Sequence, residues 1–147
     1  SRGLGDVYKR QVLNDQPGNP NALLGLAKCL LATGRAAEAR DILNAFPVSR
    51  EFASAEKLKP LAVILSQYQK SQPEPTTALD STYLHALRLV TRGNLPAAMD
   101  GILDVLRAEK NYRNGDAKQV ILGLFEILGA HNELTRQYQS ELALVLF

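Results

Sequence analysis

LLGLAKCLLATGRAAEARDIL, residues 23–43, carries the clearest structural pattern in this chain of 147 residues. Its apolar side chains recur at intervals of three and four residues, which places them on one face of an α-helix. Gly34 interrupts the pattern, and a glycine can end a helix in a left-handed conformation. A second apolar stripe follows at once and stops before Pro47, which cannot continue a helix. The stretch therefore predicts a helical hairpin, whose short turn forces the two helices antiparallel.

The same pattern returns in TYLHALRLVTRGNLPAAMDGIL, residues 82–103, where Gly93 matches Gly34. The other matched positions are Ala86 with Ala27, Leu89 with Leu30, Ala98 with Ala39 and Ile102 with Leu43. The small alanines would let the two helices of each hairpin approach closely. A single hairpin cannot bury its apolar face, so a repeated hairpin indicates a stacked array. We predict an all-α solenoid of helical hairpins with about seven helices.

The segment between the two repeats predicts a degenerate unit. Gly34 and Gly93 lie 59 residues apart, which is not a multiple of a repeat of about 34 residues. An apolar stripe runs through residues 50–69, but Pro60 falls inside it, so a kink or a break is expected there. Residues 71–80 are polar and proline-containing, which is typical of a linker.

The helix starts and the last pair complete the predicted organisation. Asn21 can cap the first helix, and Asp116 with Gln119 predicts a capping box at the start of the third pair, whose first helix would end at Gly129. The repeat domain is expected to span residues 12–147, with pairs at about 21–47, 50–72, 78–110 and 114–147.

Residues 1–11, SRGLGDVYKRQ, resemble a translated library adapter and are interpreted as a non-native or disordered terminus, with a native frayed terminus as the alternative.

The composition argues against several classes of function. The net charge is only +2, whereas nucleic-acid binding needs a concentrated basic face. Apolar runs such as residues 61–65 are far shorter than the roughly 18 residues that would cross a membrane. We therefore expect no nucleic-acid partner, no membrane partner and a cytoplasmic location.

The chemistry-bearing residues predict no catalytic, cofactor-binding or metal site. The single cysteine, Cys29, cannot form an internal disulfide, and it is expected to be a buried or half-buried helix residue. His85 takes the place of Leu26 in the first repeat, and we expect it to pack on a helix face. His131 falls at a helix junction. Paired carboxylates and a phosphate-binding loop are not evident, so the chain is not expected to be an enzyme.

Two stretches resemble known families. GRAAEARDIL, residues 34–43, and the alanine and glycine spacing around it resemble the tetratricopeptide repeat (TPR). NYRNGDAKQVILGLFEILGAHNELTRQYQSELALVLF, residues 111–147, resembles the C-terminal end of YbbN/CnoX-type thioredoxin-like proteins, the chaperedoxins, in which a thioredoxin domain precedes TPR-like repeats. The resemblance covers about residues 13–147 and is strongest from residue 112 onward.

The resemblance to chaperedoxins implies a role in protein folding and redox protection, with unfolding clients and the chaperonin as partners. The thioredoxin domain is not among these 147 residues, and Cys29 does not match its active-site position. Redox activity is therefore not carried over to this sequence. A generic TPR scaffold within a multiprotein assembly remains open as the alternative, and the oligomeric state is not predicted.

In a TPR array, the first helix of each hairpin lines a concave groove that binds protein segments. Turning each first helix away from its hairpin partner gives the predicted groove residues Leu24, Lys28, Leu31, Tyr83, Leu87, Arg88 and Val90. Apolar side chains exposed in a groove would mark an interaction site. The alternative is that the next repeat covers them. Leu24 and Lys28 stand where a clamp for a peptide carboxylate would need Lys and Asn, which disfavours that type of adaptor.

The tail LALVLF, residues 142–147, is apolar on almost every side. The stripe Leu134, Tyr138, Leu142 and Val145 is expected to cover the preceding helix, since a terminal repeat needs a cap. Leu144 and Phe147 cannot share that face, so we expect them to be exposed. They are predicted to form a docking element for a partner with an apolar groove. A homodimer contact, or burial in the core, is the alternative.

Overall fold

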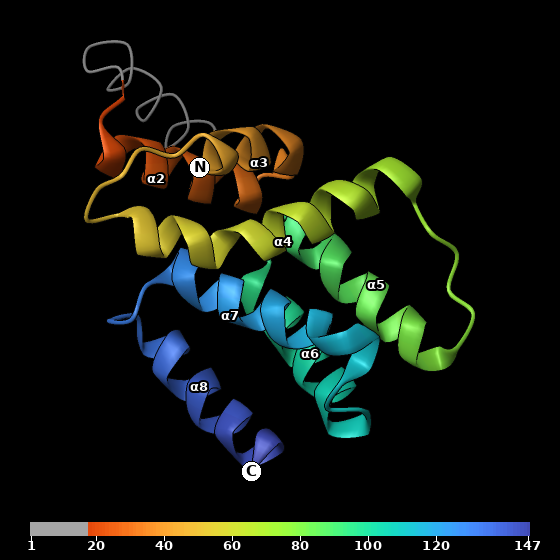
Figure 1. Cartoon of the computed structure of the whole chain (residues 1–147). Helices are drawn as coiled ribbons and strands as arrows, with labels where there is room; N and C mark the ends of the chain where they lie inside the picture. The colour runs from red at the N-terminus through yellow and green to blue at the C-terminus, as the bar shows by residue number, and fades with distance from the viewer. Residues whose placement is uncertain (1–17) are drawn as a thin grey trace.

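The computed structural model describes residues 18–147, which hold seven α-helices and no strand (Figure 1). The helices are α2 (Pro20–Ala32), α3 (Ala36–Asn44), α4 (Phe52–Ser71), α5 (Ala78–Thr91), α6 (Leu95–Ala108), α7 (Asp116–Leu128) and α8 (Glu133–Leu146), with a 3-10 turn, η1 (Tyr112–Gly115), before α7. The prediction of an all-α fold of helical hairpins is confirmed. The interpretation of residues 1–11 falls outside the described residues.

The two hairpins predicted as repeats have the same turn. Arg35 donates its backbone N–H to the carbonyl of Leu30 at 2.8 Å, and Asn94 donates to the matched Leu89 at 2.9 Å. The residue before each donor is the predicted glycine, with φ at +80° in the first hairpin and +78° in the second. These bonds satisfy carbonyls that the helix end would otherwise leave without partners. The residues that the sequence alignment matches therefore have the same backbone conformation and the same hydrogen bond in both turns.

The matched side chains of the two hairpins also form matched parts of the core. Ala27 and Ala86, Ala39 and Ala98, and Leu43 and Ile102 are all fully buried. One pair differs, because Leu30 is fully buried and Leu89 is half-buried.

The start of α2 differs from the prediction. Asn19, rather than Asn21, caps it by accepting the N–H of Ala22 at 3.2 Å, because Pro20 occupies the first helical position.

The turns of the two hairpins meet each other. A Cβ atom added to Gly34 would lie 2.8 Å from the backbone oxygen of Thr91, and one added to Gly93 would lie 3.0 Å from the backbone oxygen of Ala32. Each turn thus presses its backbone against the end of the other hairpin's first helix. Gln69 of α4 donates its side-chain N–H to the carbonyl of Gly34 at 2.8 Å. Segments far apart in the sequence are joined at this point.

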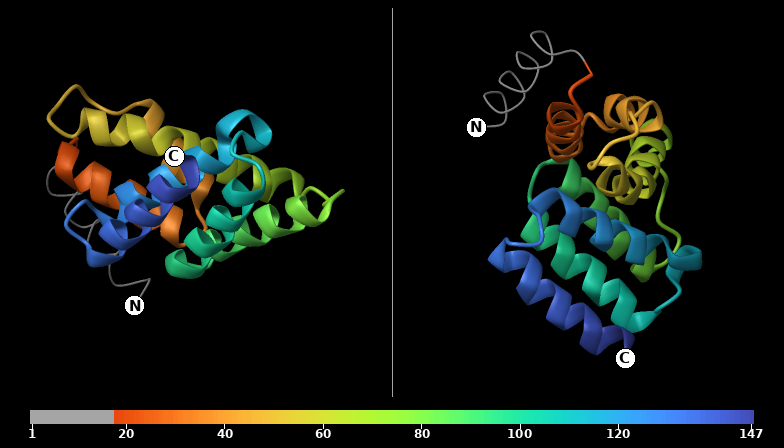
Figure 2. Two further views of the ribbon diagram at one scale, coloured as in Figure 1. Left: turned by 90° about the horizontal axis from the view of Figure 1, so that it is seen from below. Right: turned by 60° about the vertical axis from the view of Figure 1, so that its left-hand side comes forward.

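Helix α4 occupies the middle of the molecule, where it packs against α3 on one side and α7 on the other (Figures 1 and 2). It runs without a break from Phe52 to Ser71 with Pro60 inside, so of the expected kink or break the break is wrong, and the kink stays a prediction. An interior proline costs about 3 kcal/mol. The apolar face of α4 is buried between its two neighbours, and each large side chain buried there contributes about 1.5–3 kcal/mol, which offsets that cost.

The contact between α4 and α7 is close because α7 offers a glycine to it. A Cβ atom at Gly123 would lie 2.8 Å from the Cβ of Leu61.

The capping box predicted from Asp116 and Gln119 does not form, because Gly115 takes the cap position and has no side chain to accept a hydrogen bond. The right-hand view of Figure 2 shows α7, α6 and α8 side by side, with α2, α3 and α4 above them in that view.

Candidate functional site

Five of the seven predicted groove residues are buried. Leu24 is 8% exposed, Leu31 0%, Tyr83 1%, Leu87 2% and Val90 0%. Their expected exposure in a groove is therefore wrong, and the alternative of coverage by neighbouring elements holds. The physical reason is that α2 lies against α3, α4 and α5, while α5 lies against α6 as well. Lys28, half-buried, and Arg88, exposed, are accessible, and a binding role for them stays a prediction.

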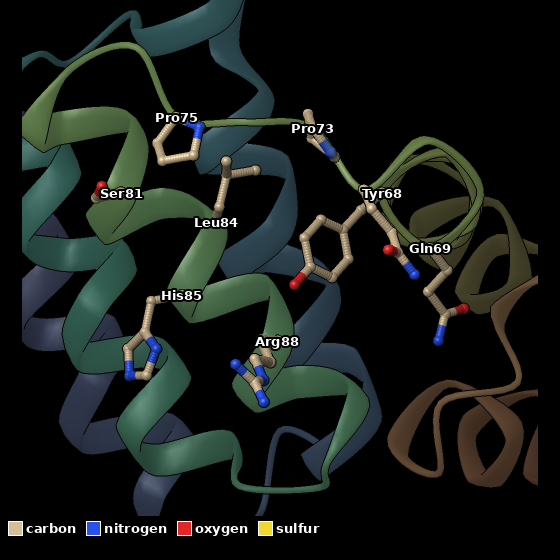
Figure 3. Close-up of a pocket in the computed structure, with 9 residues that line it drawn as sticks. Tyr68, Gln69, Pro73, Pro75, Ser81, Leu84, His85 and Arg88 are labelled. Atoms are coloured by element: carbon tan, nitrogen blue, oxygen red, sulfur yellow. The ribbon is translucent and has the colours of Figure 1, made fainter.

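Arg88 lies in a pocket of about 740 Å³ between the end of α4 and α5, which we call the α4/α5 pocket (Figure 3). Its lining residues are Tyr68, Gln69, Gln72, Pro73, Pro75, Ser81, Leu84, His85 and Arg88. Figure 3 shows the ring of Tyr68 extending from α4 toward α5, where His85 and Arg88 stand one helical turn apart. The expectation that His85 packs on a helix face is wrong, because its side chain is exposed in this pocket.

The backbone between α4 and α5 gives the α4/α5 pocket its shape. Gln72 ends α4 in a left-handed conformation with φ at +44°, which turns the chain away from the helix axis. Pro73 and Pro75 then hold the linker to a narrow range of φ. Gln69 is fixed by its bond to Gly34, and Leu84 is buried beneath the opening. These features restrict the linker backbone and the Gln69 side chain, which form part of the pocket wall.

Lys28 lines a different hollow of about 410 Å³, between α2 and α7, together with Leu24, Cys29 and Ile127. Cys29 is half-buried there, as expected for a helix residue of this kind. This hollow shares no lining residue with the α4/α5 pocket. The two accessible residues of the predicted groove therefore open onto separate surfaces.

A cluster around Asp80 joins the start of α5 to the turn before α7. One carboxylate oxygen of Asp80 accepts hydrogen bonds from the hydroxyl of Thr76 at 2.6 Å and from its N–H at 3.2 Å. The other accepts the hydroxyl of Tyr112 and lies 3.8 Å from the guanidinium of Arg113. These bonds favour the charged carboxylate, and the pKa of Asp80 is lowered to about 2.

Aromatic rings complete this cluster. The rings of Tyr83 and Tyr112 have centroids 5.0 Å apart, and the guanidinium of Arg113 lies 5.1 Å from the centroid of Tyr83. Burial raises the pKa of the Tyr83 phenol, and its hydroxyl finds no hydrogen-bond partner among the described residues. The cluster was not predicted from the sequence. The pattern of Thr77 followed three residues later by Asp80, a helix-start signature, could have located its centre.

Acid is expected to destabilise the fold through Asp80. A carboxyl group whose pKa is lowered on folding adds stability above its unfolded pKa, and that stability is lost as the pH falls through the folded value. The relevant window runs from the ordinary value of 3.8 down to about 2. Urea denaturation across this window should show a smaller pH dependence in Asp80→Asn than in the parent. Asp104 is exposed and lies 2.9 Å from Arg107, so Asp104→Asn is the control. Its free energy of unfolding should change with pH as much as that of the parent. The same change with pH in all three proteins would contradict this role of Asp80.

The C-terminal helix leaves apolar side chains in solvent. Leu144 is 82% exposed and Phe147 is fully exposed, as predicted, while Leu142 is buried against the core. Tyr138 anchors the helix by donating its hydroxyl hydrogen to Asp100 of α6 at 2.7 Å. The docking role of Leu144 and Phe147 stays a prediction.

Within residues 18–147, no three His, Cys, Asp or Glu side chains gather in a way that could hold a metal ion. No helix in this same part of the chain has the length and apolar character needed to span a bilayer.

These features define a helical-repeat protein made of antiparallel hairpins. A tetratricopeptide repeat model matches residues 55–147, and a second tetratricopeptide repeat model matches residues 8–57. The chain belongs to the tetratricopeptide repeat family. Repeats of this family indicate a protein–protein interaction module and are typically non-catalytic scaffolds. No curated protein and no solved structure matches the chain significantly.

Proposed function

We propose that the chain is the C-terminal interaction part of a thioredoxin-like co-chaperone, which acts in protein folding and redox protection in the cytoplasm. In this role it binds unfolding client proteins and docks to the chaperonin. The observation that carries the proposal is the exposed apolar end of α8, which lies within the block that resembles the chaperedoxins.

The exposed end of α8 has the properties of a docking element. Leu144 in α8 and Phe147 directly after its last residue are exposed, whereas Leu142 packs against the core. Arg107 and Glu141 stand beside Leu144 and Val145 around a hollow of about 510 Å³. An apolar helix face with charged residues at its rim suits binding in an apolar groove of a larger partner.

The test is capture of the chain by immobilised chaperonin, comparing the parent with the double variant Leu144→Asp/Phe147→Asp. Both side chains are exposed, so the double variant should fold, and circular dichroism checks this. We expect its capture to fall strongly, because a charged side chain cannot enter an apolar groove without losing its hydration. Val48→Asp, at a position 93% exposed outside the helices, is the matched control and should be captured like the parent. Equal capture of the parent and the double variant, or capture of neither, would contradict the docking role.

The alternative function is a generic TPR scaffold that joins subunits of a multiprotein assembly. The α4/α5 pocket favours it, because a pocket with a restricted wall and polar side chains suits a defined partner better than a range of unfolding clients. Suppression of aggregation of a thermally unfolding client separates the two functions. A co-chaperone should suppress aggregation and lose this effect in Leu144→Asp/Phe147→Asp, whereas a scaffold should have no effect in either form.

A further inference from the structure

We propose that the α4/α5 pocket is a separate binding site for an acidic segment of a partner protein, in which Arg88 pairs with an Asp or Glu carboxylate. The inference rests on the proposed function only in taking the occupant to be a protein. It does not depend on the chaperonin or on the exposed end of α8.

The charge of the α4/α5 pocket carries the argument. Arg88 and His85 line it, and no carboxylate is among its lining residues. Glu74 lies in the linker but does not line the pocket, and no carboxylate of residues 18–147 forms an ion pair with Arg88. Three other hollows on the described surface combine a basic side chain with an acidic one, whereas the hollow beside Lys28 also has no acidic lining residue but offers a lysine in place of an arginine: the three pairs are Arg107 with Glu141, Lys57 with Glu126, and Arg136 with Glu133. The α4/α5 pocket therefore offers a positive charge that the fold itself does not neutralise.

The donors in the pocket suit a carboxylate. A guanidinium presents two parallel N–H groups that match the two oxygens of a carboxylate, which makes such pairs stronger than neutral hydrogen bonds. Tyr68 and Ser81 line the same space, and a hydroxyl is a group that can donate a further hydrogen bond to a carboxylate. Phosphate recognition generally uses a cluster of arginines, whereas a single arginine, Arg88, is among the lining residues of this pocket. The arrangement therefore favours a carboxylate over a phosphorylated side chain.

The remaining walls suit the neighbours of that carboxylate in an extended peptide. Pro73, Pro75 and Leu84 supply apolar surface beside the charged groups. The volume of about 740 Å³ falls within the roughly 300–1,000 Å³ typical of ligand sites, which fits a short segment rather than a whole helix. Since the linker prolines and the Gln69 bond already restrict part of the wall, little ordering should oppose binding.

The experiment measures fluorescence anisotropy of a short fluorescein-labelled peptide with an Asp-Pro-Asp centre, and of a matched peptide with Asn-Pro-Asn. We expect the Asp peptide to bind, more weakly as salt is added, and the Asn peptide to bind at least about tenfold more weakly. Arg88→Ala should weaken binding of the Asp peptide by about tenfold or more, and Arg88→Lys should have a smaller effect because it keeps the charge but loses the paired N–H groups. Arg136→Ala removes the same charge from the hollow that contains Glu133, and it should bind like the parent.

The site would be refuted by equal binding of the Asp and Asn peptides, by no binding of either, or by equal losses in Arg88→Ala and Arg136→Ala. Binding of a phosphoserine peptide but not of the Asp peptide would also refute it. Arg88 is exposed, so circular dichroism should show that its variants remain folded. Leu144→Asp/Phe147→Asp should bind the Asp peptide like the parent, and Arg88→Ala should be captured by the chaperonin like the parent. Failure of this site and failure of the proposed function are therefore distinguishable.

Discussion

Gly34→Ala is expected to lower the free energy of unfolding by about 2–5 kcal/mol. Two costs add at this position. An alanine resists the left-handed backbone, where φ is +80°, and its Cβ would lie 2.8 Å from the backbone oxygen of Thr91. A backbone oxygen within a helix cannot rotate aside as the end of a side chain can. The turn of the second hairpin would have to move away, which would open the contact between the two repeats. Urea denaturation followed by circular dichroism measures the change.

Gly115→Ala is the matched control for this contact. Gly115 also has a left-handed backbone, with φ at +96°, but nothing lies within 4 Å of an added Cβ atom. Its replacement should cost only the backbone strain, about 1–2 kcal/mol. The difference between the two variants isolates the meeting of the two turns. If Gly34→Ala cost no more than Gly115→Ala, the two hairpins would not be in contact through their turns.

Gly123→Ala is expected to destabilise the protein by up to about 2 kcal/mol, although alanine is the better helix former. Replacing a glycine inside a helix gains up to about 1 kcal/mol, whereas overpacking costs about 1–3 kcal/mol. The added Cβ would lie 2.8 Å from the Cβ of Leu61, an atom held by the backbone of α4, so overpacking should win. Thermal and urea denaturation should both show the loss.

Gly101→Ala offers the same substitution at a looser contact. An added Cβ would lie 3.2 Å from the Cβ of Ala86, so a small shift of α6 against α5 could relieve it. We expect a change close to zero, because the gain in helix propensity offsets the tighter contact. If Gly123→Ala were as stable as Gly101→Ala, the α4–α7 contact would be looser than described.

The hairpins were predictable from the sequence because their causes are local. Helical spacing of apolar residues and a glycine after each first helix fix the helices and their turns, and both glycines have the predicted left-handed backbone. The burial of Ala39 and Ala98 also followed from the alignment of the repeats. The exposure of Leu144 and Phe147 was predictable for a similar reason, since a helix can bury only part of a fully apolar surface.

The features that were not predicted from the sequence depend on elements that are distant in the chain. Leu31 and Val90 were expected in a groove, but the meeting of the two hairpins covers them. Pro60 indicated a break on local grounds, whereas packing on both sides keeps α4 whole. The α4/α5 pocket depends on the left-handed Gln72 and on the path of the linker, which no periodic pattern reports. In each case tertiary contacts outweigh a local preference.

The central position of α4 has a consequence for how the molecule unfolds. In a linear array of repeats each unit contacts only its neighbours, so the ends can fray while the middle persists. Here α4 contacts α7 and α2 contacts α5, which links units that are not consecutive. Loss of α4 would remove support from both halves at once. The described part of the chain should therefore melt as one cooperative unit, with the slowest amide hydrogen exchange in α4 and faster exchange in α8.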